Sequence, residues 1–541
     1  MRAWWRDAVF YQIYPRSFAD SDGDGIGDLR GIIDHMDFLR GAEHSLGVDA
    51  LWISPFYPSP MADFGYDISN YCDVDPVFGT LADFDELIRE AHGRGLRVLL
   101  DFVPNHTSDR HSWFRSSRSS TADPRRDWYV WRSGRGDSPP NNWMAEFRGI
   151  GSAWTFDAPT NEWYLHSFLP SQPDLNWDNP EVERAMHGVM EFWLNRGADG
   201  FRVDVVHKIG KAPDLRDNAG VFVGPGRADR GNRFDEDWPS VHPRIRRMRT
   251  LARRHGACIL VGEVYVLDAE QMAAYVRTGR ELDLAHNFEF LTLPWKAAAF
   301  RDAIREAPGL LGPRGWPTWC LNNHDHSRVA SRYPGEQAAR VAAMMLLTLR
   351  GTPFLYQGEE LGLEDGVVSG EEQTDVEGRD PERCPIPWVS PDAQHAWAGF
   401  SSVRPWLPIP PDASVHNVAD EWRNPQSVLT LYRALLRARH ETPALRSGSL
   451  ELIDADSPDL LAYRRSFRDS ERLVALNFGL EPASLAGVLG AERSARIVLS
   501  SRMDGVGGLV GADTAIPPLT GWLMTPSGLE GALPTPGRAS A

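Results

Sequence analysis

Eight short apolar runs, separated by stretches of helical periodicity, restrict the fold of this chain more than any other feature of its sequence. The runs occupy residues 9–14, 48–53, 97–103, 200–203, 258–262, 284–288, 318–322 and 353–356. Helical patterns between them cover 81–94, 182–196 and 336–350. Apolar strands that alternate with helices are typical of a parallel sheet covered on both faces. The series therefore predicts an α/β fold of the (β/α)8 TIM barrel type.

Two long interruptions and a final change of pattern predict the rest of the architecture. Residues 105–171, after the third strand, are rich in Trp, Arg and Pro, which predicts an inserted subdomain with a small core of its own. A long loop at 359–426 is expected to form part of the rim over the strand ends. Short alternating runs at 450–453, 460–464, 473–477 and 497–499 predict a C-terminal antiparallel β domain. The expected domains are barrel at 1–104, insert at 105–171, barrel again at 172–446 and β domain at 447–541.

Charge and cysteine usage narrow the possible partners and compartment. The 541-residue chain has a net charge of −17 and an isoelectric point near 5.4, so nucleic acid and anionic membranes would be repelled. Its cysteines, at positions 72, 258, 320 and 384, form no CxxC pair and show no metal-ligand spacing. The first residues contain no secretory leader, and no segment is apolar enough to span a membrane. These features predict a reduced, cytoplasmic enzyme acting on a small neutral or cationic molecule.

Four acid-bearing segments follow one another along the chain, each at the start or the end of an apolar run. They are Asp101-Phe-Val-Pro-Asn-His106, Gly200-Phe-Arg-Val-Asp204, Gly262-Glu-Val and Asn323-His-Asp325. One such acid alone is more often a helix cap or a surface carboxylate. Acids and histidines gathered at successive strand ends are typical of the active site of a barrel enzyme.

Two of these acids have the properties needed to break a glycosidic bond. Asp204 is the candidate nucleophile, because Arg202 points to the same face of the strand and favours the charged carboxylate. Glu263 is the candidate acid/base, because it follows a buried apolar run that favours its protonated form. Two carboxyls about 5 Å apart would retain the anomeric configuration through a glycosyl-enzyme intermediate.

These segments, with Gln172-Pro-Asp-Leu-Asn176 as a fifth, resemble the conserved regions of the α-amylase family of glycoside hydrolases. The similarity runs from Trp4 to about Pro408 and is most specific toward the α-glucosidase and oligo-1,6-glucosidase branch. It implies that Asp204 is the nucleophile, Glu263 the acid/base and Asp325 a stabiliser of the transition state. The residues implied to hold the non-reducing glucose are Asp63, Tyr66, His106, Gln172, Arg202, His324 and Arg383.

The implied glucose site is expected to be closed at one end. Asp63 and Arg383 would lie behind the glucose 4-hydroxyl, so that only a chain terminus could enter. Asp101 has two interpretations of equal weight, direct contact with substrate and orientation of Arg202.

Acids alternate with glycines and one serine in the segment from Asp20 to Asp28, Asp-Ser-Asp-Gly-Asp-Gly-Ile-Gly-Asp. One tight loop of this kind presents several oxygens to one hard cation. The resemblance adds the carbonyl of Ile26 to the carboxylates of Asp20, Asp22, Asp24 and Asp28. We expect structural Ca²⁺, with Mg²⁺ as an alternative; the competing interpretation is a solvated acidic turn.

The leading prediction is a retaining exo-α-glucosidase that releases glucose from short α-glucosides. The alternative is an α-glucosyltransferase or trehalose-forming isomerase, which uses the same intermediate. A sucrose isomerase is disfavoured because no charged aromatic clamp is evident. By resemblance Val205 favours α-1,6 over α-1,4 cleavage, but His207 and Lys208 depart from the pattern of that branch, so linkage stays open. The sequence makes no prediction of oligomeric state.

Overall fold

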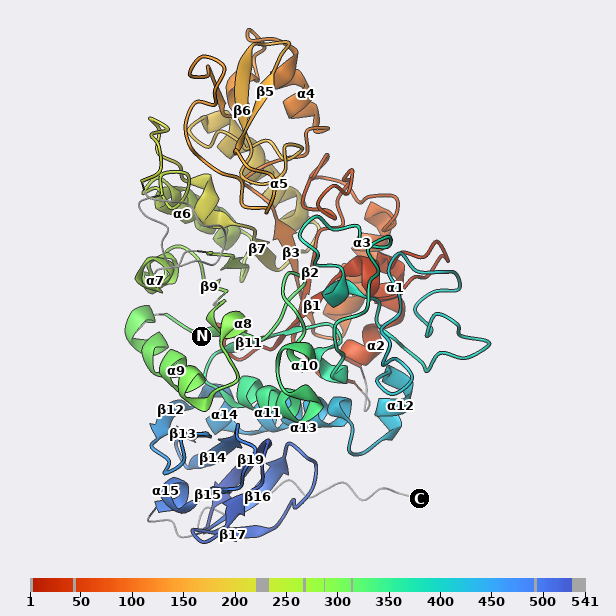
Figure 1. Cartoon of the computed structure of the whole chain (residues 1–541), viewed down its shortest axis with the longest axis vertical. Helices are drawn as coiled ribbons and strands as arrows, with labels where there is room; N and C mark the ends of the chain where they lie inside the picture. Colours follow the sequence, from red (N-terminus) through yellow and green to blue (C-terminus); the bar gives the residue numbers. More distant parts are fainter. Residues whose placement is uncertain are drawn as a thin grey trace.

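The computed structural model describes residues 3–41, 45–219, 233–265, 269–286, 288–312, 315–490 and 494–527. Three parts follow one another along the long axis of the molecule (Figure 1). The insert lies at the top, the parallel sheet and its helices occupy the middle, and the C-terminal antiparallel sheet lies at the bottom.

All eight predicted strands form one parallel sheet, in the order β10-β11-β1-β2-β3-β7-β8-β9. Their bounds are β1 Phe10–Ile13, β2 Ala50–Ile53, β3 Arg97–Phe102, β7 Gly200–Val203, β8 Ile259–Gly262, β9 Leu284–Ala285, β10 Thr318–Cys320 and β11 Thr352–Tyr356. The side-chain hydroxyl of Thr318 in β10 donates a hydrogen bond to the carbonyl of Ala285 in β9, which links the two end strands. The sheet therefore forms the predicted barrel, with a seam between β9 and β10.

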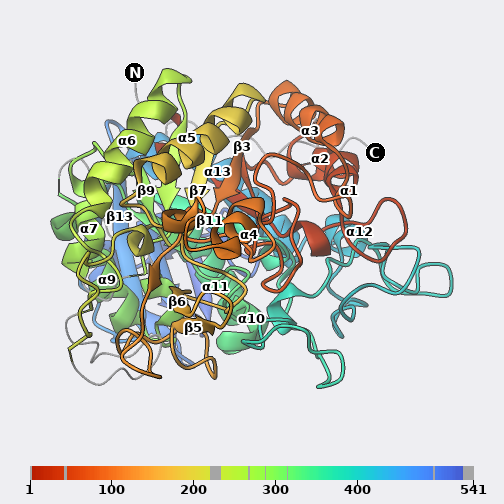
Figure 2. The same ribbon diagram turned by 90° about the horizontal axis from the view of Figure 1, so that it is seen from above.

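Helices cover the outer face of the barrel, and Figure 2 shows α3, α5, α6, α7 and α9 around the strands. The longer helices are α3 Leu81–Gly93, α5 Pro180–Asn195, α6 Val241–Arg254, α7 Ala269–Arg277, α9 Ala297–Leu311, α11 Gly335–Thr348 and α13 Val428–Glu441. The shorter ones are α1 Leu29–Asp34, α2 Met36–Leu39, α4 Ser112–Ser119, α8 Glu289–Thr292, α10 Val329–Arg332, α12 Val418–Arg423, α14 Pro443–Ser447 and α15 Ala486–Leu489. Local sequence sets several starts: Thr80 and Asp83 form a capping box on α3, and Asn179 caps α5.

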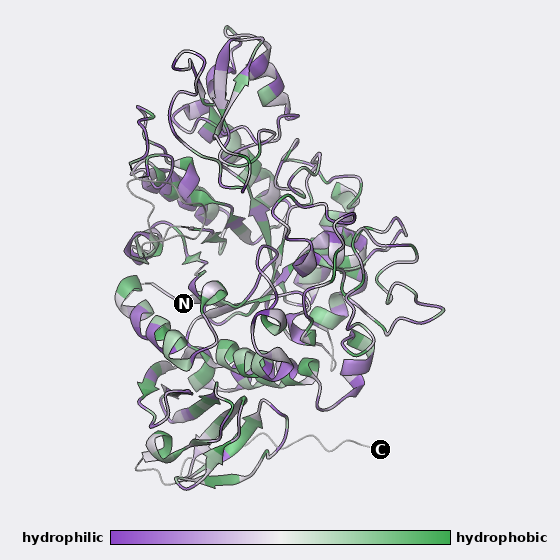
Figure 3. Cartoon of the chain, in the orientation of Figure 1, coloured by the Kyte–Doolittle hydropathy of each residue, from purple (hydrophilic) through white to green (hydrophobic). Residues whose placement is uncertain are grey.

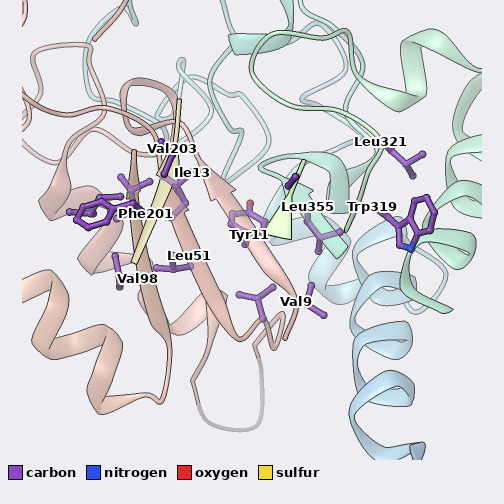
Figure 4. Packing of buried hydrophobic residues seen from close by; sticks show 14 of the residues in the cluster. Val9, Tyr11, Ile13, Leu51, Val98, Phe201, Val203, Trp319, Leu321 and Leu355 are labelled. Carbon is purple, nitrogen blue, oxygen red and sulfur yellow. The ribbon is translucent and has the colours of Figure 1, made fainter. Parts of the chain in front are cut away.

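The barrel strands bury both faces. Tyr11 and Ile13 belong to the large cluster between strands and helices, part of which is drawn in Figure 4. Phe10, Trp52 and Phe354 belong to a separate cluster inside the barrel. Because side chains alternate across a strand, one continuous apolar run supplies both layers.

The insert has a small sheet and its own core, as predicted. Its strands, β4 Trp131–Arg132, β5 Trp154–Asp157 and β6 Glu162–Leu165, pair in the order β4-β6-β5. Trp143, Trp154 and Leu165 are buried together there.

The C-terminal part is an antiparallel sheet, as predicted, that packs against α11. Its six main strands are β12 Ser449–Ile453, β13 Leu460–Phe467, β14 Ser470–Asn477, β16 Ser494–Ser500, β17 Leu509–Gly511 and β19 Thr520–Pro526, and β15 Ala483–Ser484 pairs with β18 Ala515–Ile516. Figure 3 colours much of α11 and the adjoining strands as hydrophobic. Every residue of α11 from Ala338 to Thr348 is buried, and the helix packs against α10 and α13 as well as β14 and β19 of this sheet.

Within the described residues, no helix combines the length and apolar character needed to cross a lipid bilayer.

Candidate active site

A cavity of about 430 Å³ opens at the carboxyl ends of the barrel strands. Its lining residues come from the barrel loops, the insert and the long loop after β11. They are Asp63, Tyr66, His106, Glu146, Phe147, Arg148, Phe168, Asp204, Val205, His207, Lys208, Glu236, Glu263, Tyr265, His324, Asp325, His326, Glu377 and Arg379. The three predicted catalytic acids thus share one cavity.

One buried guanidinium holds three of the predicted carboxyls together. Arg202, on β7, is 1 % exposed, and its Nη1 lies 2.7 Å from both Asp101 Oδ1 and Asp204 Oδ1. Its Nη2 lies 2.8 Å from Glu263 Oε2. Trp52 Nε1 and the Tyr66 hydroxyl donate to the other oxygen of Asp101 at 2.9 and 3.1 Å. Asp101 is absent from the cavity lining, so its geometry fits the orientation of Arg202 and not contact with substrate.

Burial shifts the ionisation of these acids. Burial, followed by the neighbouring Glu263 carboxylate, raises the pKa of Asp204, and the Arg202 guanidinium opposes both effects. The sequence predicts that Arg202 keeps Asp204 charged, but burial outweighs the effect of this guanidinium. Burial likewise raises the pKa of Asp101 to about 6, although Arg202 acts to lower it. The Asp204 carboxyl therefore holds a proton more readily than a free carboxyl does.

Backbone strain occurs directly after Asp204. Val205 has φ 32° and ψ 46°, a left-handed conformation that a β-branched residue rarely adopts. This turn points the Val205 N–H at Glu263 Oε2, 3.0 Å away, while the Val206 N–H bonds the Glu263 carbonyl at 3.1 Å. The strained turn thus directs two backbone N–H groups at Glu263, and these hydrogen bonds fix its position relative to Asp204.

A tight loop after β2 brings Asp63 and Tyr66 into the cavity. The Asp67 carboxylate accepts hydrogen bonds from the N–H groups of Ala62 and Asp63, both at 3.0 Å, and from the Ser59 hydroxyl at 2.8 Å. These bonds close the loop around one buried acid.

The loop that ends the insert supplies Gln172. Its amide donates to Asp63 Oδ2 at 2.9 Å and lies 3.2 Å from His106 Nε2. Buried Asp174 anchors the loop, since it accepts from the Ser167 N–H and hydroxyl and pairs with Lys211 at 2.9 Å. Gln172, His106 and Asp63 therefore form one connected group.

The cation beside Asp63 is Arg379, not the expected Arg383. Arg379 Nη2 lies 2.8 Å from Asp63 Oδ1, and its Nη1 lies 2.9 Å from Asp325 Oδ1. Arg383 is 1 % exposed and sits behind this pair, where its Nη2 is 3.1 Å from Asp325 and its Nε donates to the His324 carbonyl. Asp375 pairs with both arginines, at 2.6 and 3.3 Å.

Asp325 stays charged in this surrounding. Burial acts to raise the pKa of Asp325, but His324, Arg379 and Arg383 together lower it well below the usual range. His324 Nδ1 accepts from the Gln12 amide at 2.8 Å, and its Nε2 lies 3.3 Å from Asp325 Oδ2. The Tyr66 ring stacks on the His324 ring at 5.4 Å with a 7° angle between planes. His324 is thus held at both ring nitrogens and on one face.

Several lining residues were missed by the sequence reasoning. Arg379 lies in the same segment as Arg383, and Asp375, four residues before it, is a signal for the turn that carries it. Glu146, Phe147 and Phe168 come from the insert, whose course over the cavity no local pattern reveals.

The loop from Asp20 to Asp28 places three carboxylates together. Oxygens of Asp20, Asp22 and Asp24 lie within 4.8 Å of one another. Such a set suits a hard cation, which prefers oxygen ligands. Asp28 is engaged differently, since its oxygens accept from the Gly31 N–H at 2.7 Å, as the N-cap of α1, and from the Ser21 N–H at 2.8 Å.

The arrangement defines a class of enzyme. Two adjacent buried carboxyls on one guanidinium, with a third acid held charged by arginines, can carry attack, protonation and charge stabilisation at an acetal carbon. A barrel that carries these groups at the carboxyl ends of its strands has the active site of a glycoside hydrolase.

Comparison with known proteins gives the family. The family model described as "Alpha amylase, catalytic domain" matches residues 12–448, and the chain belongs to this family of glycoside hydrolases.

Curated relatives match nearly the whole chain. A probable alpha-glucosidase of Rhizobium meliloti (strain 1021) is 42 % identical over 89 % of this chain and 91 % of its own length. An oligo-1,6-glucosidase of Parageobacillus thermoglucosidasius and a trehalose-6-phosphate hydrolase of Escherichia coli (strain K12) are each 37 % identical over 88 % of this chain and 91 % of their own.

Solved structures share the fold over the same extent. The alpha-glucosyl transfer enzyme XgtA superposes with a TM-score of 0.87 at 40 % identity and covers 97 % of this chain and 100 % of its own. The trehalulose synthase MutB of Pseudomonas mesoacidophila MX-45 does so with 0.87 at 34 % identity, covering 96 % and 99 %.

Proposed function

We propose that this protein is a retaining exo-α-glucosidase that removes one glucose at a time from the non-reducing end of short α-glucosides. The observation that carries the exo assignment is the network of Asp63, Arg379 and Asp325, which closes one end of the cavity with paired charges. A glucose bound against it has no room for a further residue on its 4-hydroxyl. The names of the relatives support the same substrate class.

In the proposed mechanism Asp204 attacks the anomeric carbon while the glycosidic C–O bond breaks and Glu263 gives its proton to the departing oxygen. Water then attacks the glycosyl-enzyme, loses its proton to Glu263 and frees Asp204. Asp325 would accept hydrogen bonds from ring hydroxyls that strengthen as positive charge develops, so its benefit falls in the transition state.

Glu263 is held in place by two donors on its Oε2, Arg202 Nη2 and the Val205 N–H. To reach a glycosidic oxygen, the Glu263 side chain has to turn away from both donors.

Transfer of glucose to a sugar or another alcohol is the second candidate function. It uses the same intermediate, and the solved neighbours include a glucosyl transfer enzyme and a trehalulose synthase. Whether water or an alcohol reacts depends on how the rim excludes water.

Product analysis on maltose, isomaltose, sucrose and trehalose tests both candidates. Hydrolysis predicts monosaccharides alone: glucose from maltose, isomaltose and trehalose, and glucose with an equal amount of fructose from sucrose. Transfer predicts new oligosaccharides or isomers. Asp204→Asn should lower turnover by several orders of magnitude with the circular dichroism spectrum unchanged. Activity that survived this change would contradict the proposed nucleophile.

We also propose that the loop of Asp20, Asp22 and Asp24 binds Ca²⁺, or Mg²⁺ in its place, as a structural ion, with the Ile26 carbonyl and Asp28 as further ligands. The clustered carboxylates support this proposal. A cytoplasmic location is our proposal as well, supported by the cysteines, which form no disulfide bond within the described residues.

A further inference from the structure

Five charged side chains form an ion cluster on one wall of the active-site cavity. Lys208 Nζ lies 2.5 Å from Glu146 Oε1, 2.7 Å from Glu236 Oε2 and 3.5 Å from Asp235 Oδ2. Arg233 Nη2 lies 2.6 Å from Glu146 and from Asp235, and its Nε lies 3.2 Å from Glu236. The cluster joins the insert, the turn after β7 and the chain before α6, and no step of the proposed mechanism uses it.

The ion cluster lies where a leaving group would sit. Glu146, Lys208 and Glu236 line the cavity together with Val205. Lys208 belongs to a single helical turn, Val206–Ile209, whose first N–H bonds the Glu263 carbonyl. Since Glu263 protonates the departing oxygen, the wall that continues from it faces the departing group and not the glucose held by Asp63.

Both cations of the cluster are already neutralised by carboxylates. Burial acts to raise the pKa of Glu146, but Lys208 and Arg233 lower it to about 2, so Glu146 is charged at neutral pH. Lys208 and Arg233 each contact all three acids and are only 3 % and 5 % exposed. Neither can turn toward a ligand without leaving buried carboxylates unpaired.

The charged residues that line the whole cavity, the ion cluster included, are mostly acidic. Among its lining residues, acids outnumber lysines and arginines: Asp63, Glu146, Asp204, Glu236, Glu263, Asp325 and Glu377 against Arg148, Lys208 and Arg379. Arg379 is taken up by Asp63, Asp325 and Asp375. Arg148 is exposed at the rim, where its backbone N–H bonds Glu377.

We propose that the ion cluster is a specificity device that restricts the enzyme to uncharged leaving groups and excludes disaccharides phosphorylated on the leaving glucose. A phosphate monoester brings close to two negative charges and needs cationic donors. At the ion cluster it would meet two cations that are already paired with carboxylates, in a cavity whose lining has more acids than lysines and arginines. A neutral sugar needs only hydrogen-bond partners, which the same carboxylates supply.

The inference rests on the proposed α-glucosidase function, and its test separates the two. kcat/KM is measured for maltose and for maltose 6-phosphate with the phosphate on the reducing glucose, or for trehalose and its 6-phosphate if trehalose is the better neutral substrate. We expect kcat/KM to be about 100-fold higher for the neutral substrate, because repulsion of the phosphate by each of two carboxylates would lower it roughly tenfold. Inactivity on every neutral glucoside would sink the proposed function, whereas equal activity on both members would sink only this inference.

Glu146→Gln tests the cluster directly, because it keeps the shape and releases charge on Lys208 and Arg233. The ratio of kcat/KM for the phosphorylated over the neutral substrate should rise about tenfold. A purely structural role would lower both rates together and leave the ratio unchanged. Glu236→Gln gives an independent second measurement, and Asp302→Asn on α9, in an exposed ion pair with Arg305, is the matched control. An unchanged ratio in both cluster variants, with native circular dichroism, would overturn the proposal.

Discussion

At the scale of single residues, the site was predictable where a strand fixes the side chain and not where a loop does. Asp204 and Arg202 follow from their places on β7, because residues two apart point to one face of a strand. Arg379 and Arg383 are four apart in one turn, so the local sequence could not tell which meets Asp63. The contact between Arg379 and Asp63 spans 316 positions and depends on the course of the rim loop.

Replacing Arg379 with lysine should lower the catalytic rate considerably, although the substitution keeps the positive charge. Arg379→Lys keeps the charge but cannot bond Asp63, Asp325 and Asp375 at once, because an ammonium lacks the planar fork of a guanidinium. We expect kcat/KM on the best neutral glucoside to fall at least tenfold, measured by steady-state kinetics. Arg404→Lys, in an exposed pair with Glu372, is the control. Equal kinetics for the two variants would show that Arg379 does not shape the glucose site.

At the scale of elements, apolar periodicity located every barrel strand but not every strand of the last domain. β19 is buried at all seven of its residues and includes Gly521 and Pro526, so it shows neither alternation nor a clean β-forming run. β9 is formed by two residues of the predicted run at 284–288, in which residue 287 lies outside the described residues. A strand also depends on the strands with which it pairs. These partners are distant in the sequence, as β16 is from β19, so the local sequence does not reveal them.

The turn after β11 carries two buried glutamates that make stability depend on pH. Burial raises the pKa of Glu359 to about 8 and that of Glu360 to about 7. The Tyr432 and Tyr11 hydroxyls donate to them, each at 2.8 Å. A carboxyl whose folded pKa lies above its unfolded value binds its proton more tightly when folded. The protonated glutamate therefore contributes fully to the free energy of unfolding at pH 4, and this contribution is lost as the pH rises to about 8.

Glu359→Gln should remove part of this dependence, because the amide keeps an oxygen acceptor for Tyr432 and carries no charge. Between pH 5 and 8 the native protein should lose on the order of 3 kcal/mol more unfolding free energy than the variant. Urea unfolding of both proteins at each pH measures the difference. Glu451→Gln, at an exposed site on β12, should behave as the native protein does. A difference that did not depend on pH would contradict the assignment.

At the scale of the whole molecule, two buried arginines bond backbone carbonyls around the end of α11 and tie it to α13 and to the C-terminal sheet. Arg439 on α13 donates to the carbonyls of Leu347, near the end of α11, and of Leu349 and Gly351 after it. Arg465 on β13 donates to those of Thr348, Leu445 and Gly448. The carbonyls at the end of a helix carry partial negative charge, which suits these cations. Burial lowers the pKa of Arg439 to about 10 and that of Arg465 to about 9.

The proposed metal loop connects the start of the barrel to the rim loop over the cavity. The Asp20 N–H bonds the Phe400 carbonyl at 2.9 Å, and the Trp406 N–H bonds the Gly25 carbonyl at 3.0 Å. Trp406 in turn lies under the Arg16 guanidinium, 4.6 Å from its ring centre. These contacts tie the loop to the rim that surrounds the cavity, so we expect a change of order in the loop to affect the rim.

Chelation should consequently loosen the rim as well as lower stability. A cation that binds only the folded protein adds about 2.7 kcal/mol at 100 times its dissociation constant. We expect the apparent melting midpoint to fall by a few degrees in chelator and to recover with Ca²⁺ or Mg²⁺, whichever is bound. Asp22→Asn should melt at the chelated temperature under both conditions, because the cluster of Asp20, Asp22 and Asp24 loses a charge.

Limited proteolysis should then cut the rim between 359 and 426 faster in chelator. Identical melting and cleavage with and without chelator would mean that the carboxylates form a solvated turn, and that Asp20 supports the rim by hydrogen bonds alone.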